Sequence, residues 1–223
     1  IPVRVHAWFW LLGLFLSLGD LGFEHKLFNA VIYFGWASAA LVGILAHELG
    51  HALTGRHFGS RGVRILVHAF GGATLNATGR TRAQRIAVIA AGPAVDIVLG
   101  IVLAVCLLAV YTVSGLDFGQ RPRGVLLHAL VLVLGCHVLV ALFWGAFNLL
   151  PVYPMDGGQI LMELLTAGRP AGRRTVHVVS IAAAVALAFL GMAWGQFFLV
   201  ILFGYFAYLN FQLLQQGGMR SGW

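Results

Sequence analysis

The sequence predicts an all-α polytopic membrane protein of about six transmembrane helices, with a small membrane-associated β-hairpin between the second and third of them. Of its 223 residues, 60% are hydrophobic and only 9% are charged, whereas about a quarter of the residues in a soluble domain carry charge. The apolar residues gather in long runs that are almost free of charge. No internal repeat or soluble appendage interrupts them, so we expect one membrane domain over residues 1–223.

Five apolar runs account for the six expected spans, because a helix needs about 20 residues to cross the hydrocarbon core. The first run is read as a short span rather than a removed signal, since no clear small-residue cleavage site follows it. The last run would form one helix about 67 Å long, so we divide it at Gly191–Gly195. The runs are residues 5–19, 27–55, 86–116, 124–155 and 175–219.

A change of character between residues 56 and 85 predicts the hairpin. Two β-prone runs, Val63–Ala69 and Ala73–Thr78, lie on either side of Phe70-Gly71-Gly72. Paired glycines between such runs are typical of a β-hairpin. The alternation of apolar and polar residues is imperfect, so an ordinary connecting loop is the alternative.

The basic residues predict the orientation in the membrane. Six spans place the N-terminus, the 56–85 segment, the 167–174 segment and the C-terminus on one side. That side holds all 14 basic residues except Lys26, Arg121 and Arg123. The positive-inside rule assigns it to the cytoplasm. The net charge of +7 is therefore a topology signal, and we expect no nucleic-acid partner.

The segment His47-Glu48-Leu49-Gly50-His51 has the pattern H-E-x-x-H and lies in the last third of the second run. Residues four apart lie on one face of a helix, so the two imidazoles can point at one shared point. Two neutral imidazoles at this spacing suit zinc, and the glutamate is placed to take a proton from an attacking water. The sequence thus predicts a zinc site at the cytoplasmic end of the second span.

Catalytic zinc usually has three protein ligands, so a further acidic residue is expected. Asp96, Asp156 and Glu163 are the candidates, because the acidic residues outside the motif that remain, Asp20, Glu24 and Asp117, fall in loops on the far side of the membrane. Asp156 is favoured, since residues 148–159 contain two prolines and two glycines that must break regular helix and indicate a pocket. Zinc with ionised Glu48 and Asp156 has no net charge, which lowers the cost of burial.

These motifs resemble those of the site-2 protease family of intramembrane zinc metalloproteases. The resemblance rests on His47-Glu48-Leu49-Gly50-His51, on Asn148-Leu149-Leu150-Pro151 and on Met155-Asp156-Gly157-Gly158. Phe70-Gly71-Gly72 and Ala91-Gly92-Pro93 are also similar, so the likeness covers most of residues 5–165.

The resemblance implies one Zn²⁺ per chain, bound by His47, His51 and Asp156, with Glu48 as the catalytic acid and base and Asn148 in contact with substrate. It also implies hydrolysis of a peptide bond within or near a transmembrane segment of a membrane-bound regulatory protein, such as an anti-sigma factor or a membrane-bound transcription factor. The expected partners are this substrate and the lipid bilayer. We expect an integral, multi-pass protein of a prokaryotic cell membrane.

The sequence departs from the family pattern at one position near the site. Family members often carry asparagine three residues after the Gly-Pro pair, where this chain has Asp96. A structural hydrogen-bonding role is favoured for Asp96, and a pH-sensitive residue or a site contributor are the alternatives. Nothing resembles the PDZ insertion or the appended CBS domain of many relatives, so neither is expected.

Two other functions fit parts of the sequence. A prenyl-protein-type membrane metalloprotease would take its third ligand from a downstream glutamate, and Glu163 is the one that follows the motif. A non-enzymatic polytopic transporter or binding protein is the second alternative, although no repeated pair of broken helices is seen. Glu163 instead either lines the cytoplasmic mouth or pairs with an arginine of residues 169–174, and the pairing is favoured. His137 either lines the site or makes a hydrogen bond between helices.

Overall fold

A computed structural model describes five stretches of the chain in two compact units. The first unit comprises Ile1–Arg80 and Ala91–Ala146, and the second comprises Thr81–Ala90 and Phe147–Trp223. The described stretches are residues 1–17, 26–68, 71–116, 124–166 and 170–219.

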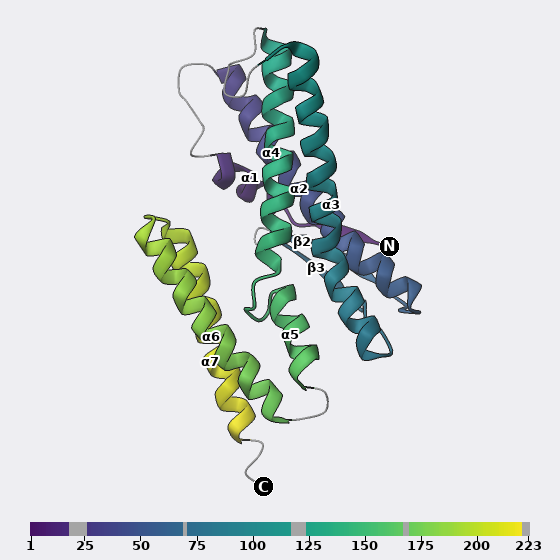
Figure 1. Ribbon diagram of the computed structural model, residues 1–223, viewed down its shortest axis with the longest axis vertical. Coiled ribbons are helices and arrows are strands. Elements are labelled where there is room, and N and C mark those ends of the chain that lie inside the picture. The colour runs from purple at the N-terminus through teal and green to yellow at the C-terminus, as the bar shows by residue number, and fades with distance from the viewer. Residues whose placement is uncertain (18–25, 69–70, 117–123, 167–169, 220–223) are drawn as a thin grey trace. The chain divides into compact units, whose positions relative to one another are not determined.

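Helices make up most of the described chain (Figure 1). Within the described stretches, five of them are long and apolar enough to cross a membrane, namely α2, α3, α4, α6 and α7. This confirms the predicted polytopic helical protein. The helices are α1 Phe9–Ser17, α2 Lys26–His57, α3 Arg82–Ser114, α4 Val125–Asn148, α5 Asp156–Thr166, α6 Pro170–Ala193 and α7 Phe197–Met219.

The first expected span, residues 5–19, differs from the prediction. Val3–Val5 form a strand, β1, and the helix that follows, α1, has nine residues. Nine residues rise about 14 Å, less than half of a hydrocarbon core. The described part of the chain therefore has five helices of spanning length against the six or so expected, and residues 18–25 lie outside it.

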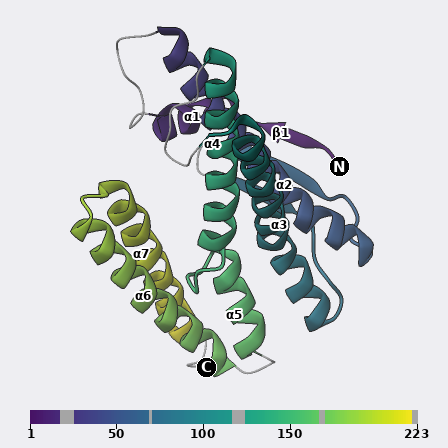
Figure 2. The same cartoon turned by 45° about the horizontal axis from the view of Figure 1, so that its top comes forward.

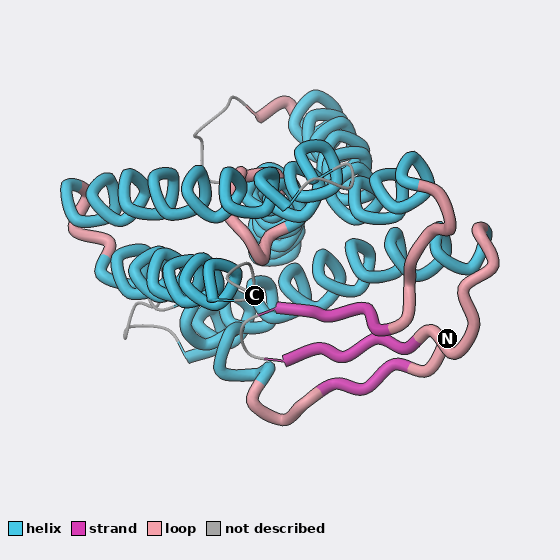
Figure 3. Tube along the Cα trace, turned by 90° about the horizontal axis from the view of Figure 1, so that it is seen from below, coloured by secondary structure: helices cyan, strands magenta, loops and turns pink. Residues whose placement is uncertain are grey.

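The predicted hairpin is present, which excludes the alternative of an ordinary loop. Strands β2 (Arg64–His68) and β3 (Gly71–Leu75) pair antiparallel, and β1 adds to β2 in parallel. Among the described residues the strand order is β1-β2-β3, as the three strands lying side by side in Figure 3 show. Phe70, between the strands, lies outside the described residues.

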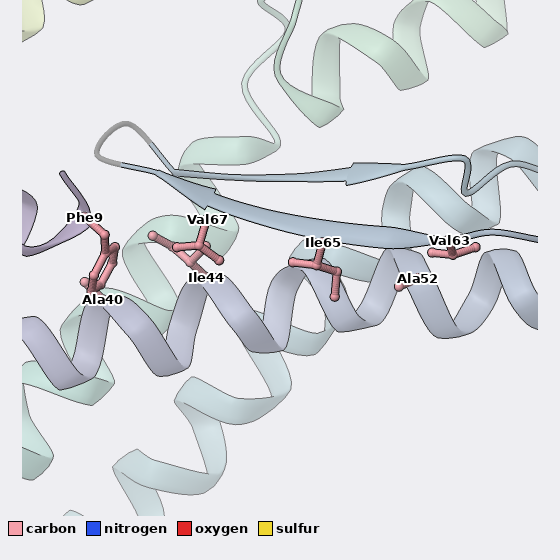
Figure 4. Packing of buried hydrophobic residues seen from close by; sticks show 7 residues of the cluster. All are labelled: Phe9, Ala40, Ile44, Ala52, Val63, Ile65 and Val67. Atoms are coloured by element: carbon pink, nitrogen blue, oxygen red, sulfur yellow. The ribbon is translucent and has the colours of Figure 1, made fainter. Parts of the chain in front are cut away.

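The sheet packs on α2 through the alternate side chains of one strand. Ile65 and Val67 of β2 are buried and point toward the helix, because successive side chains of a strand face opposite ways, and Val63, just before the strand, is buried with them. On α2 they meet Ala40, Ile44 and Ala52, and Phe9 of α1 closes the cluster (Figure 4). The small alanines let strand and helix approach closely, so the sheet is fixed against the helix that carries H-E-x-x-H.

Glycines allow close helix contacts within the first unit. A Cβ on Gly50 of α2 would lie 2.6 Å from the carbonyl oxygen of Ala91 in α3. A Cβ on Gly100 of α3 would lie 2.5 Å from Leu142 Cδ2 of α4. Small residues at such positions let helix backbones come together in a membrane. The H-E-x-x-H segment of α2 is therefore held directly against the start of the Gly-Pro segment of α3.

The second unit is built on the antiparallel pair α6 and α7, which run side by side in both cartoon views (Figure 2). The chain turns between them at Gly195, whose φ is +68°, close to the turn expected at Gly191–Gly195. Val152 and Met155, from the loop before α5, are buried with Ala184 of α6 and Phe203 of α7. The loop that leads into α5 thus packs on the α6–α7 pair.

Replacing Gly50 tests the close approach of α2 to α3. Gly50→Ala is expected to destabilise the protein by about 1–3 kcal/mol, because the added methyl group overpacks against the Ala91 carbonyl. Gly135→Ala in α4 is the matched control, since a Cβ there meets nothing within 4 Å. The control is expected to be neutral or stabilising by up to ~1 kcal/mol. Thermal unfolding in detergent micelles measures both, and equal midpoints for the two variants would contradict this packing.

Candidate metal centre

The H-E-x-x-H segment lies within α2, as expected, and its polar side chains are turned away from the surface. His47, Glu48 and His51 are only 4%, 5% and 9% exposed. Residues at positions i and i+4 lie one above the other on a helix, so the two imidazoles share one face. Burial of three ionisable side chains in an apolar helix is costly unless they have partners.

The two imidazoles face each other through the nitrogens that bind metals. The Nε2 atoms of His47 and His51 lie 3.0 Å apart, with ring centroids 4.7 Å apart. Two imidazoles bound to one tetrahedral zinc, at Zn–N distances of about 2.0–2.1 Å, would have their nitrogens about 3.3 Å apart. The pair is therefore already close to the spacing that a shared divalent metal requires.

Asp96 of α3 fixes the orientation of the first imidazole. Its Oδ2 atom lies 2.7 Å from His47 Nδ1, and the Asp96 side chain is completely buried. A carboxylate accepts the Nδ1–H hydrogen bond and leaves the Nε2 lone pair for a metal, the usual arrangement behind a metal-bound histidine. Asp96 thus has the structural hydrogen-bonding role that was favoured for it. The residue that it orients, His47, belongs to the candidate site itself.

Gly92 leaves the space in front of the imidazoles. A Cβ at this position would overlap His51 Nε2 and lie 2.8 Å from His47 Nε2. Any larger residue would fill the volume into which both nitrogens point. Two converging imidazole nitrogens, a buried carboxylate behind one of them and a cradle that only glycine keeps open fit a divalent metal with a preference for nitrogen, such as zinc.

Strand β3 supports Glu48. Thr74 Oγ1 lies 2.5 Å from Glu48 Oε2 and 3.0 Å from the Glu48 carbonyl oxygen, and so can donate to either. A Cβ on Gly72 would lie 2.5 Å from Glu48 Oε1, so the glycine makes room for the carboxylate. Sequence reasoning missed Thr74, because one threonine in a β-prone run carries no signal of its partner. The Gly-Gly pair, which predicted the hairpin and contributed to the family resemblance, was the available clue.

Asp156 and Asn148 belong to the second unit. Asp156 is the first residue of α5 and is 7% exposed, while Asn148 ends α4 and is half-buried. The chain between them folds back tightly. A Cβ on Gly157 would overlap the Leu149 carbonyl oxygen, and one on Gly158 would overlap the Tyr153 backbone nitrogen. The Asp-Gly-Gly sequence is therefore required to place a carboxylate at the end of this turn.

Two other residues singled out in the sequence have ordinary partners. His137 Nδ1 lies 2.8 Å from the carbonyl oxygen of Val133 in its own helix, so the expected hydrogen bond is made within α4 rather than between helices. Glu163 pairs with Arg85, whose Nε and Nη2 donate to its two carboxylate oxygens at 2.8 and 2.9 Å. The expected ion pair is present, but its partner is in α3 and not in residues 169–174.

In the first unit, the structure thus brings together His47, Glu48, His51 and Asp96 in one buried cluster. A polar, imidazole-rich cluster inside apolar spanning helices defines the chain as a membrane-embedded metalloprotein.

Known proteins that are similar to this chain indicate which kind of membrane-embedded metalloprotein it resembles. Residues 123–191 match the family model of peptidase family M50. Zinc metalloprotease MJ0392 of Methanocaldococcus jannaschii is 32% identical over 167 residues, which are 74% of this chain and 43% of the relative. The protein sll0528 of Synechocystis is 36% identical over 172 residues, 74% of this chain and 42% of the relative. The site-2 protease from Methanocaldococcus jannaschii has a similar fold, with a TM-score of 0.60 and 24% identity over 96% of this chain and 90% of that one.

The family match over residues 123–191 and the likeness to two zinc metalloproteases confirm the resemblance to the site-2 proteases of peptidase family M50. The stretch that matches the family model contains both Asn148 and Asp156. The chain spans less than half the length of the two curated relatives, and the structural likeness shows a shared fold.

Variants at Asp96 test its support of His47. Asp96→Leu is expected to weaken Zn²⁺ binding about 10–100-fold, the usual cost of losing the group behind a histidine ligand. Asp96→Asn keeps an oxygen that accepts from Nδ1–H, so it is expected to retain most of the affinity. Competition with a chelator of known affinity measures both. Wild-type affinity in Asp96→Leu would show that the hydrogen bond does not support metal binding.

Proposed function

We propose that this protein is an intramembrane zinc metalloprotease that hydrolyses a peptide bond within or near a transmembrane segment of a membrane-bound regulatory protein. The observation that carries the proposal is the pair of buried imidazoles on α2, with their Nε2 atoms 3.0 Å apart and Glu48 beside them. Two imidazoles that can bind a metal, with a carboxylate beside them that can accept a proton, suit hydrolysis inside a spanning helix at membrane depth.

The proposed cofactor is one Zn²⁺ held by His47, His51 and Asp156. When bound, zinc polarises a carbonyl group and lowers the pKa of water toward neutrality. The buried carboxylate that begins α5 supports the choice of Asp156, and the relative MJ0392 is itself a zinc metalloprotease. Glu163, the third ligand that a prenyl-protein-type enzyme would need, is engaged with Arg85, which favours Asp156.

Glu48 is proposed as the catalytic acid and base. Its carboxylate would accept a proton from the attacking water and return it to the leaving amine. Thr74 holds Oε2 from the side of β3, which restrains the carboxylate in one orientation. Asn148, at the end of α4, is proposed to contact the substrate backbone through its amide, which can both donate and accept.

The proposed substrate is a membrane protein with a single span, such as an anti-sigma factor or a membrane-bound transcription factor. Such a protein presents its cleavage site at the depth of a buried centre, which a soluble peptide does not reach. The location proposed for this chain is a prokaryotic cell membrane, which agrees with the archaeal and cyanobacterial sources of the two relatives.

Replacing Glu48 separates chemistry from metal binding. Glu48→Gln is expected to keep one zinc per chain but to reduce cleavage at least ~100-fold, because general acid–base catalysis contributes about 10²–10⁴. Glu163→Gln is the matched control and is expected to keep both zinc and cleavage. The measurements are zinc content of the purified protein and the shortened product formed on co-expression with candidate single-span proteins. Cleavage at the wild-type rate in Glu48→Gln would rule out this mechanism, and loss of zinc in Glu163→Gln would favour the prenyl-protein-type alternative.

The centre is proposed to lie nearer the cytoplasmic face. The strongly basic 56–85 segment follows α2 directly. Pairing of β1 with β2 keeps the N-terminal strand beside that segment.

Cysteine labelling in intact cells tests this orientation. Arg61→Cys, in the exposed segment after α2, is expected to resist a membrane-impermeant maleimide. Gln196→Cys, in the exposed turn between α6 and α7, is expected to react. Labelling of Arg61→Cys from outside would reverse the proposed orientation.

A further inference from the structure

The α6–α7 pair carries polar side chains in its buried interior. Asn210 of α7 and Ser180 of α6 are completely buried, and His177 of α6 is 8% exposed. Polar groups in such surroundings are costly unless they are hydrogen-bonded. None of these three side chains has a role in the chemistry proposed above, so their positions need another explanation.

All three side chains are directed at one residue of the loop before α5. Ser180 Oγ accepts a hydrogen bond from the Tyr153 backbone nitrogen at 3.0 Å. Asn210 Nδ2 donates to the Tyr153 carbonyl oxygen at 2.6 Å and to the Phe206 carbonyl oxygen at 2.8 Å. Both backbone groups of Tyr153 are therefore bound by side chains of α6 and α7.

His177 completes the network. Its Nδ1 lies 2.9 Å from Asn210 Oδ1, which orients the amide so that Nδ2 points at the loop. The His177 ring also meets the Tyr153 ring edge to face, with centroids 5.8 Å apart. The hydrogen bond from His177 to Oδ1 thus fixes the orientation of the Asn210 amide, in the way that a hydrogen bond to a metal ligand fixes the orientation of that ligand.

The remaining residues between Tyr153 and Asp156 form a short and well-fixed connection. Met155 is buried and packs with Val152, Ala184 and Phe203. Its backbone nitrogen donates to the Val152 carbonyl oxygen at 2.8 Å, and its own carbonyl oxygen accepts from Gln159 in α5 at 2.9 Å. A displacement of Tyr153 would therefore be passed on to Asp156, three residues later.

We propose that Ser180 and Asn210 are positioning residues, which clamp the backbone of Tyr153 and so hold the Asp156 carboxylate in place for the metal. This proposal rests on the assignment of Asp156 as a zinc ligand. A carboxylate on a clamped turn loses little freedom when it binds, whereas one on a loose loop must be ordered first and binds more weakly.

Removal of the clamp is expected to speed zinc loss while the helices remain. Asn210→Leu and the smaller change Ser180→Ala should each release zinc to a chelator about 10–100-fold faster than wild type, the range found when groups behind a ligand are removed. The control is Gln212→Leu, which makes the same kind of change on the exposed side of α7, where the amide donates a hydrogen bond to Tyr208 in the same helix. Zinc release from the control should equal that of wild type.

The experiment uses zinc-loaded full-length protein in detergent micelles. Zinc release is followed at a fixed temperature with a chromogenic chelator, and the thermal midpoint of each variant is measured in parallel. Faster release from Ser180→Ala, at a temperature well below its midpoint, supports the clamp even where Asn210→Leu fails to fold. A lowered midpoint with wild-type release in Ser180→Ala assigns the network to helix packing alone and overturns the proposal.

Asp156→Ala separates this proposal from the one on which it rests. If Asp156→Ala retains zinc as tightly as wild type, the ligand assignment itself is wrong. If Asp156→Ala loses zinc while Ser180→Ala and Asn210→Leu release it at the wild-type rate, the ligand assignment stands and the clamp is wrong.

Discussion

The burial of polar side chains on one face of α2 determines how the first unit is built. His47, Glu48 and His51 lie in an apolar helix, where an unpaired polar group costs several kcal/mol. The packing of the neighbouring elements therefore has to bring a hydrogen-bond partner to these buried polar side chains. Asp96 of α3 reaches His47 and Thr74 of β3 reaches Glu48. Glycines at positions 50, 72 and 92 are the counterpart of these contacts, because each leaves the volume that a carboxylate, an imidazole or a neighbouring backbone occupies.

The second unit applies the same principle to a loop. Asp156 follows a turn whose backbone cannot complete a regular helix, so its orientation depends on what surrounds the turn. Apolar packing of Val152 and Met155 fixes the position of the turn, while directional bonds from Ser180 and Asn210 to Tyr153 fix its orientation. Hydrophobic contact alone is non-directional, so the orientation that we propose for the Asp156 carboxylate depends on the polar side chains within the α6–α7 pair.

The sequence predicted those features that depend on residues close to one another along the chain. Hydropathy located the spanning helices, the four-residue spacing placed His47 and His51 on one face, and the Gly-Gly pair located the hairpin. Features that depend on distant partners were missed or misassigned. Strand β1 has three residues and no alternation of its own, and it exists because β2 offers it an edge. Glu163 was matched to nearby arginines, whereas its partner Arg85 is 78 positions away. Thr74, Ser180 and Asn210 are single polar residues in apolar runs, and such residues show no period that could reveal what they contact.

The orientation of α2 follows from a reversal of the usual helix pattern. In water a helix turns its apolar face inward, but a helix in lipid has no polar solvent for its other face. Leu49 and Leu53, four residues apart, are 37% and 57% exposed, while Glu48 and Ala52, each one position earlier, are buried. The leucines suit contact with lipid, and the glutamate suits contact with protein. In this part of α2, one face of the helix is suited to lipid and the opposite face carries the side chains of the candidate metal centre.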